Sequence, residues 1–255
     1  MDIPLILLCA FAFLAGFIDS IVGGGGLVQV PAFFVLYPAL PVPNVIGTNR
    51  LASAVGTSVA AWNYSRRVAI PWRAVGFAAL GAALLSYLGA TVQSRLPSEV
   101  LKPIILVLII AIAAYTFRKK DFGHEPHERV SPGRLPWYAL GIGMALGFYN
   151  GFVGPGTGSL LVFAFVSVLG YTFLTASPAA KIVNVVADVT SLVFFLVNKY
   201  VLFHLALPMM ACNVAGSYAG SRMAMLRGNA FVRKVFLVVV AGIVLRFAYD
   251  VIRLW

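Results

Sequence analysis

The stretch GFIDSIVGGGGLVQVP, from Gly16 to Pro31, places an acid and four consecutive glycines inside an apolar run that extends from residue 3 to residue 40. Four glycines in succession do not hold a helix, because each costs about 1 kcal/mol relative to alanine. In hydrocarbon every backbone polar group needs a partner, so such a segment is tolerated where it lines a protein-walled cavity or a ligand site. We therefore interpret Gly23 to Gly26 as a break between two helical pieces, with Asp19 just before it. A flexible loop at the bilayer surface is the alternative.

The composition is that of a polytopic membrane protein. Of the 255 residues, 61% are hydrophobic and 11% are charged, and the mean hydropathy is +0.94, outside the range of soluble globular domains. The first apolar segment lacks a Lys/Arg-rich start and a small-residue cleavage pattern, so we expect no removable signal peptide. A net charge of +11 is also found in nucleic-acid-binding proteins, but most Lys and Arg here fall in short loops beside apolar segments, where they report orientation. This distribution disfavours nucleic-acid binding.

The apolar segments form two sets on either side of a polar linker. They are predicted at residues 4–22, 27–41, 45–64, 72–92 and 100–117, and again at 136–153, 158–174, 176–197, 203–221 and 234–252. We divide the chain into a first transmembrane repeat (1–117), a cytoplasmic linker (118–135) and a second repeat (136–255). His124 and His127 in the linker are interpreted as solvated residues rather than a metal pair. The second piece of each broken run is short, so whether it crosses the membrane or is re-entrant stays open.

The two sets are copies of each other, offset by 131 residues. Gly16 falls on Gly147, and the run SYLG at 86–89 falls on SYAG at 217–220, without a gap. Internal duplication is typical of transporters whose substrate sites lie at the repeat interface near the bilayer midplane, built from discontinuous helices. The fold predicted is an all-α polytopic membrane protein with two repeats of about five helical segments each.

Basic residues indicate that the repeats are inverted. The loop at 65–73 carries three arginines, whereas its counterpart near 198–204 has one lysine. The bias reverses for the next loop: 93–102 has two basic residues and a glutamate, whereas 222–234 has three arginines and a lysine. Because Lys/Arg-rich loops face the cytoplasm, corresponding loops face opposite sides. We predict that both termini lie outside.

Arg50 and Lys181 are the most informative polar residues, because ionisable residues within the membrane mark a site by default. They occupy the same position in the two repeats, and each begins a polar stripe on one helix face. The first stripe is Arg50, Ser53 and Thr57, and the second is Lys181, Asn184 and Asp188.

Two basic groups on either side of the midplane, with helix N-termini offering backbone donors, suit an anion. The alternative is structural: both cations snorkel or pair internally, Lys181 with Asp188 and Arg50 with Asp19. The two acids are either counter-ions for these cations or proton carriers. Neither is duplicated, because Asp19 is replaced by Asn150 and Asp188 by Thr57.

The second break, GFVGPGTG at 151–158, interposes Pro155 among its glycines, and proline forbids a regular helix there. Two Gly/Pro-interrupted segments at corresponding places are the best sequence indication of a transporter's binding site. A nucleotide-binding loop is excluded, since no GK[ST] follows and no βαβ unit surrounds the glycines.

The remaining polar residues carry less weight. Gln29 after the first break is a candidate neutral contact, whereas Arg246 and Asp250 suggest an interfacial pair. Cys9 and Cys212 offer neither a disulfide framework nor metal spacing, so we expect them to be core residues. An intramembrane enzyme would need a nucleophile with its base or a metal cluster, and a lone His204 supplies neither.

Four motifs together resemble the TauE/SafE sulfite exporter family, also called TSUP: GFIDSIVGGGG at 16–26, GTNRLASAVGT at 47–57, GFYNGFVGPGTG at 147–158 and AAKIVN at 179–184. The resemblance covers nearly the whole chain. It implies a permease, mostly bacterial, for small sulfur-containing anions such as sulfite and organosulfonates, in some cases exported. It transfers only the motif positions Asn49, Arg50, Lys181 and Asn184.

We therefore predict a secondary transporter that exports a small anion, most consistent with sulfite or an organosulfonate, from a bacterial inner membrane. The alternatives are a passive anion channel or an importer of another oxyanion or a carboxylate. No cofactor or metal is expected; a proton or sodium ion is the candidate coupling ion, and the oligomeric state stays open. The predicted substrate-binding residues are Asn49, Arg50, Ser53, Thr57, Lys181, Asn184, Gly23, Gly24, Gly25, Gly154 and Gly156, with Asp19 and Asp188 as coupling or counter-ion residues.

Overall fold

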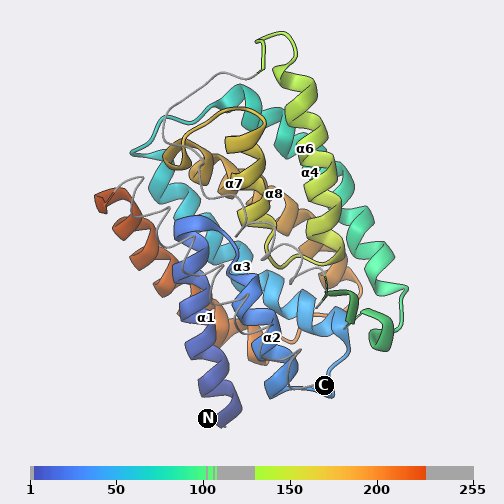
Figure 1. Cartoon of the computed structure of the whole chain (residues 1–255). Coiled ribbons are helices and arrows are strands. Elements are labelled where there is room, and N and C mark those ends of the chain that lie inside the picture. The colour runs from blue at the N-terminus through green and yellow to red at the C-terminus, as the bar shows by residue number, and fades with distance from the viewer. Residues whose placement is uncertain (1–2, 102, 106, 108–129, 228–255) are drawn as a thin grey trace, which may run out of the picture.

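The computed structural model describes residues 3–101, 103–105, 107 and 130–227, and every regular element within these ranges is helical (Figure 1). The helices with defined bounds are α1 (Ile3–Val22), α2 (Gly26–Leu36), α3 (Val42–Ser65), α4 (Trp72–Ser94), α6 (Leu135–Phe152), α7 (Thr157–Ser167) and α8 (Phe173–Val197). Residues 98–107 and 203–227 are also helical wherever they are described. The all-helical prediction is thus confirmed over this part of the chain.

Several predicted features fall on residues that are not described. They are the segment 100–117 beyond residue 107, the linker up to residue 129, which contains His124 and His127, and the segment 234–252, which contains Arg246 and Asp250.

Among the described residues, three helices are long and apolar enough to cross a membrane: Ile3–Ile21, Trp72–Ser94 and Phe173–Val197. Large apolar side chains point outward from them, as in Leu14 of α1, Leu84 of α4 and Val193 of α8, which are between 48% and 60% exposed. Outward-facing apolar side chains of this density are stable against lipid rather than water. The protein is an integral membrane protein.

Local sequence sets the ends of the shorter helices. α2 ends at Leu36 because Pro38 disfavours the helical conformation of the residue before it. α7 ends at Ser167, and Gly170 turns the chain with φ of 82°. The predicted segments 27–41 and 158–174 were therefore too long at their C-terminal ends. α8 begins where the Thr172 side chain accepts a hydrogen bond from the Thr175 amide, as an N-cap does.

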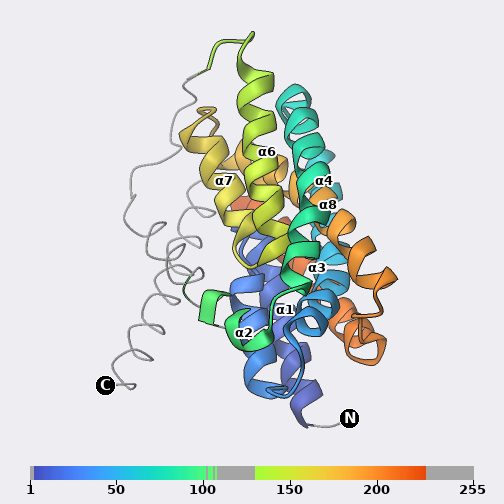
Figure 2. The same ribbon diagram turned by 90° about the vertical axis from the view of Figure 1, so that its right-hand side faces the viewer.

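Helix bounds repeat along the chain at the sequence offset of 131. α2 and α7 each contain 11 residues and are offset by 131 at both ends, and the starts of α3 and α8 are offset by the same amount. In Figures 1 and 2, α1 runs up from the N-terminus while α6 runs down from the opposite end of the molecule. At 1.5 Å per residue, α2 and α7 are each about 16 Å long, about half of the hydrocarbon thickness.

Small residues bring the long helices together. A Cβ on Gly147 of α6 would lie within 3.0 Å of three backbone atoms of Ala82 in α4, and one on Gly16 of α1 would meet the backbone of Asn213 in the helix at 203–227. Gly16 and Gly147 are equivalent in the repeat, so the same close contact occurs twice. Close backbone approach at small residues is how helices associate in membranes.

Buried apolar side chains form two clusters. One lies around Phe165, Phe173 and Val183, and the other lies around Phe33, Ile46 and Phe195.

Candidate functional site

Both helix interruptions turn at glycines with positive φ. Gly23 and Gly24 separate α1 from α2 with φ of 76° and 97°, and Gly154 and Gly156 separate α6 from α7 with φ of 87° and 86°. Side chains with a Cβ are strained in this region, so glycine is required there. The prediction of two helix breaks is confirmed, with α2 beginning at Gly26, the last glycine of the four.

The two breaks lie against each other. A Cβ on Gly23 would come within 2.7 Å of the Gly158 Cα, and one on Gly26 would lie 3.0 Å from the Pro155 Cα. Ser159 Oγ donates a hydrogen bond to the Gly23 carbonyl at 2.9 Å. The segments that interrupt the two halves therefore meet backbone to backbone.

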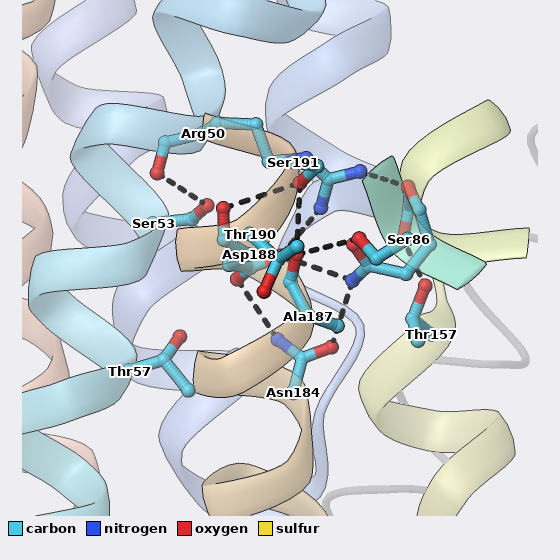
Figure 3. A network of polar contacts seen from close by, with 12 residues as sticks. Arg50, Ser53, Thr57, Ser86, Thr157, Asn184, Ala187, Asp188, Thr190 and Ser191 are labelled. Carbon is cyan, nitrogen blue, oxygen red and sulfur yellow. Dashed lines mark hydrogen bonds and ion pairs between the residues drawn. The ribbon is translucent and has the colours of Figure 1, made fainter. Parts of the chain in front are cut away.

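The side chain of Arg50, on α3 of the first half, extends to the break between α6 and α7 in the second half. Its guanidinium lies with Nη1 2.5 Å from Oδ1 of Asp188 on α8 (Figure 3), and Nη2 donates to the main-chain carbonyl of Asn150 on α6. A Cβ on Gly154 would lie 2.5 Å from Nη2, so the glycine leaves room for the guanidinium. Arg50 is 3% exposed.

Two asparagines complete the surroundings of Asp188. Asn150 Nδ2 donates to Asp188 Oδ1 at 2.9 Å and to Asn184 Oδ1 at 3.2 Å. Asn184 Nδ2 donates to Asp188 Oδ2 at 3.0 Å (Figure 3). Both carboxylate oxygens are thus hydrogen-bonded, which stabilises the charged form of a buried acid.

Lys181 occupies a separate buried position on α8. Its Nζ donates to Ser177 Oγ at 3.0 Å and lies 5.5 Å from the centre of the Tyr64 ring, within the range of a cation–π contact. Ser177 in turn donates to the main-chain carbonyl of Ile21, just before the first break. Lys181 is 2% exposed.

The structural alternative predicted ion pairs between Arg50 and Asp19 and between Lys181 and Asp188, and both predicted pairs are wrong. Arg50 pairs with Asp188 rather than Asp19. Lys181 forms no ion pair with Asp188, because the carboxylate is held by Arg50 and two asparagines. The ion pair between Arg50 and Asp188 therefore joins the two halves of the chain instead of forming within one half.

Asp19 links the first break to α3. Thr57 Oγ1 donates to Asp19 Oδ2 at 2.9 Å, and the Gly25 amide donates to Oδ1 at 3.2 Å. In the repeat, Asp19 and Thr57 are equivalent to Asn150 and Asp188, which also contact each other. The same inter-helix contact is thus made twice, with the acid on the broken helix in one half and on the unbroken helix in the other.

Charge is balanced among these groups. Arg50, Lys181 and Asp188 are the buried charged residues of the described part of the chain, and Asp19 is half-buried. Every other charged side chain whose surroundings are described is exposed. Two cations and two carboxylates therefore give a net charge of zero.

The other predicted residues lie around these clusters. Asn49 is buried, with no hydrogen-bond partner for its Oδ1. Ser53 is half-buried and donates to the carbonyl of its own helix at Arg50. Gln29 is buried near the first break and accepts a hydrogen bond from Asn213 at 3.4 Å. The sequence placed these residues on the correct elements but did not predict their partners.

Four contributing residues were not predicted as part of the site: Asn150, Tyr64, Ser159 and Ser177. Asn150 carried a usable signal, because it occupies the repeat position of Asp19. The other three are ordinary residues in apolar helices, and only their spatial neighbours single them out.

The described residues contain no group of three His, Cys, Asp or Glu side chains able to hold a metal ion. His204 is exposed. Cys9 and Cys212 are free and half-buried, so they are less buried than expected. The arrangement offers charge pairing and hydrogen bonding.

Comparison with known proteins identifies relatives described as membrane transporters. The profile of the family described as Sulfite exporter TauE/SafE matches residues 8–247. A "probable membrane transporter protein ORF9" from Sinorhizobium sp. is 35% identical, over 96% of this chain and 93% of the relative. A "probable membrane transporter protein" from Haemophilus influenzae is 31% identical, over 98% and 96%, and YfcA of Escherichia coli K12, with the same description, is 32% identical, over 97% and 91%.

No solved structure matches the chain significantly. The family profile covers more than nine-tenths of the sequence, and the helix breaks, Arg50 and Lys181 all lie within it. The chain belongs to the TauE/SafE sulfite exporter family.

Proposed function

We propose that this membrane transporter moves a small anion, sulfite or an organosulfonate, by alternating access between two inverted repeats, with Arg50 and Lys181 as the anion-binding cations. The substrate class and the outward direction follow the family's description as a sulfite exporter. The inner membrane of a bacterium is the proposed location.

The observation that carries the proposal is an unused donor on Arg50. The guanidinium donates from Nη1 to Asp188 and from Nη2 to the main-chain carbonyl of Asn150. Its Nε is buried and has no hydrogen-bond partner. A buried donor left unpaired costs about 1–3 kcal/mol, and an oxyanion oxygen would satisfy it. Asn49 and Asn150 each have a buried side-chain oxygen without a partner, which suits a protonated oxygen of the ligand or a water that accompanies it.

Three features support two inverted repeats. Helix bounds recur at a constant offset, as two copies of one unit require, and α1 and α6 run in opposite directions, as inversion requires (Figure 2). In addition, Arg66 and Arg67 of the first half line one cavity together with Arg222 of the second, which agrees with a cytoplasmic position for the basic residues of both loops. Each repeat contributes one cation to the proposed site, Arg50 in the first and Lys181 in the second. Each cation lies near the helix break of the other repeat, an arrangement that suits alternating exposure of one site.

The balance of charge indicates how transport is coupled. The two cations and two carboxylates sum to zero charge, so a bound monovalent anion would leave one uncompensated negative charge in a low-dielectric interior. A proton on Asp188 or Asp19, or a sodium ion at one of them, restores neutrality. We therefore propose that each monovalent anion travels with one monovalent cation, with export driven by the outward gradient of the anion itself.

Burial of the cations favours a transporter over a passive channel. Arg50 and Lys181 are 3% and 2% exposed, so an anion reaches them only after helices move. Proteoliposomes offered sulfite, thiosulfate, sulfoacetate, sulfate and carboxylates test the proposal. An imposed proton or sodium gradient should drive uphill movement of a sulfur-containing anion. Movement only down the anion's own gradient would identify a channel, and preference for a carboxylate would refute the substrate class.

A further inference from the structure

A second polar site lies at the end of α3, and neither buried cation lines it. A cavity of about 500 Å³ is lined by Asn63, Arg66, Arg67, Tyr218, Arg222 and Met225. The first three residues belong to the end of α3 and the turn after it, and the others belong to the helix at 203–227. The cavity therefore joins the first half of the chain to the second.

Its charge is entirely positive. Three of the six lining residues are arginines and none is acidic. The ion pair within the described residues joins Arg50 to Asp188, and it uses none of these three. Asn63 Nδ2 donates to Ser221 Oγ at 3.0 Å, which fixes the two helices to each other beside the cavity.

The surroundings of the cavity are those of a membrane interface. Trp62 is 65% exposed and lies under the Arg66 guanidinium, 5.8 Å from ring centre to Cζ. Tyr218 is 50% exposed and Leu226 is 73% exposed. Exposed Trp and Tyr gather at the level of the lipid headgroups, with apolar side chains such as Leu226 against the acyl chains.

Arginine suits the chemistry of a lipid phosphate. Its planar guanidinium binds phosphate oxygens with two parallel hydrogen bonds and stacks on aromatic rings. Basic pockets between membrane helices on the cytoplasmic side hold the headgroups of anionic lipids. A free anion would need no exposed aromatic and aliphatic side chains around the mouth of its site, whereas a phospholipid does.

We infer that this cavity binds the phosphate-bearing headgroup of an anionic membrane phospholipid, which bridges α3 of the first half and residues 218–225 of the second. The inference is independent of which anion the transport site carries. Because the lipid would contact both halves, its occupancy should stabilise their association.

The test uses delipidated, purified protein and measures its melting temperature and lipid binding by native mass spectrometry. Phosphatidylglycerol should stabilise and bind the wild type, whereas phosphatidylcholine should do neither. The triple variant Arg66→Gln, Arg67→Gln and Arg222→Gln should bind phosphatidylglycerol at least about tenfold more weakly, since each basic group near the surface contributes to lipid attraction. A matched variant loses three exposed arginines elsewhere: Arg73→Gln, Arg95→Gln and Arg134→Gln.

Equal phosphatidylglycerol binding in the wild type and the first triple variant would overturn the inference. So would equal stabilisation of the wild type by inorganic phosphate or glycerol phosphate, which would identify a site for free anions. If the triple variant does not fold, Arg222→Gln alone provides the comparison, with Arg95→Gln as its control.

Discussion

The pair formed by Arg50 and Asp188 allows a test in which two substitutions together do less damage than the sum of their separate effects. Both side chains are buried, at 4% and 2% side-chain exposure. Removing one member of a buried pair leaves an uncompensated charge and costs about 3–5 kcal/mol. For a protein of this size about 1 kcal/mol shifts the melting temperature by about 2–4 °C. We expect Arg50→Gln and Asp188→Asn each to lower it by about 6–20 °C.

The double variant removes both charges and keeps side chains able to hydrogen-bond. Its loss of stability should be smaller than the sum of the two single losses by about 0.5–3 kcal/mol, the coupling found for residues in direct contact. Thermal unfolding of the three variants in one detergent measures this, with the exposed Arg95→Gln as a control that should change little. Additive losses would refute the pairing of these charges.

Measuring the anion affinity of these variants separates the role of Arg50 in stability from its proposed role in anion binding. The double variant should fold yet bind the anion at least about tenfold more weakly, which corresponds to about 1.4 kcal/mol, because the guanidinium is absent. Arg50→Lys should retain more affinity than Arg50→Gln, since it keeps the charge without the fork geometry. Wild-type affinity in the folded double variant would exclude Arg50 from the site.

Three further substitutions or labels test other parts of the proposal. Gly154→Leu should abolish transport while the protein still inserts, because even a Cβ there would lie 2.5 Å from the Arg50 guanidinium; Gly141→Leu, which has open space around its Cβ position, should transport normally. Lys181→Gln should weaken anion binding at least about tenfold in a titration of purified, monodisperse protein, and unchanged affinity would remove it from the site. Cysteines introduced at Ser131 and Trp255 should be labelled from opposite sides of the membrane, and labelling from one side would contradict the predicted topology.

Much of the fold was predictable because a membrane helix must be apolar and long enough to cross the bilayer, and both properties can be read from the sequence. Length, hydropathy and the 131-residue repeat predicted helices close to α1, α3, α4, α6 and α8. The ends of α2 and α7 were missed, because apolar residues continue past Pro38 and Gly170 and hide the turns. Periodicity in a chain that is apolar on most faces does not mark where a helix stops.

The sequence predicted which residues belong to the site, but it did not predict which side chains they contact. The repeat identified Arg50 and Lys181 as equivalent, since both are costly in a membrane. The sequence offered Asp19 as the partner of Arg50 because both belong to the first half, whereas the actual partner is Asp188. Which carboxylate a cation finds depends on how the halves pack, and Gly23, Gly158 and Gly154 determine that by letting the breaks come together.

The two halves are equivalent in position and unequal in chemistry, and this inequality bears on how the site works. The contact between positions 19 and 57 is an acid accepting from a hydroxyl, whereas its repeat counterpart is an amide donating to an acid. Arg50 is held by the second of these pairs together with a main-chain carbonyl, while Lys181 is held by Ser177 and lies over Tyr64. If alternation exchanges the conformations of the repeats, Lys181 takes the place beside Thr57 and Asp19, and Arg50 is released from Asp188. In one state the anion would then compete with Asp188 for Arg50, and in the other with Thr57 and Asp19 for Lys181, so its affinity would differ between the two sides of the membrane.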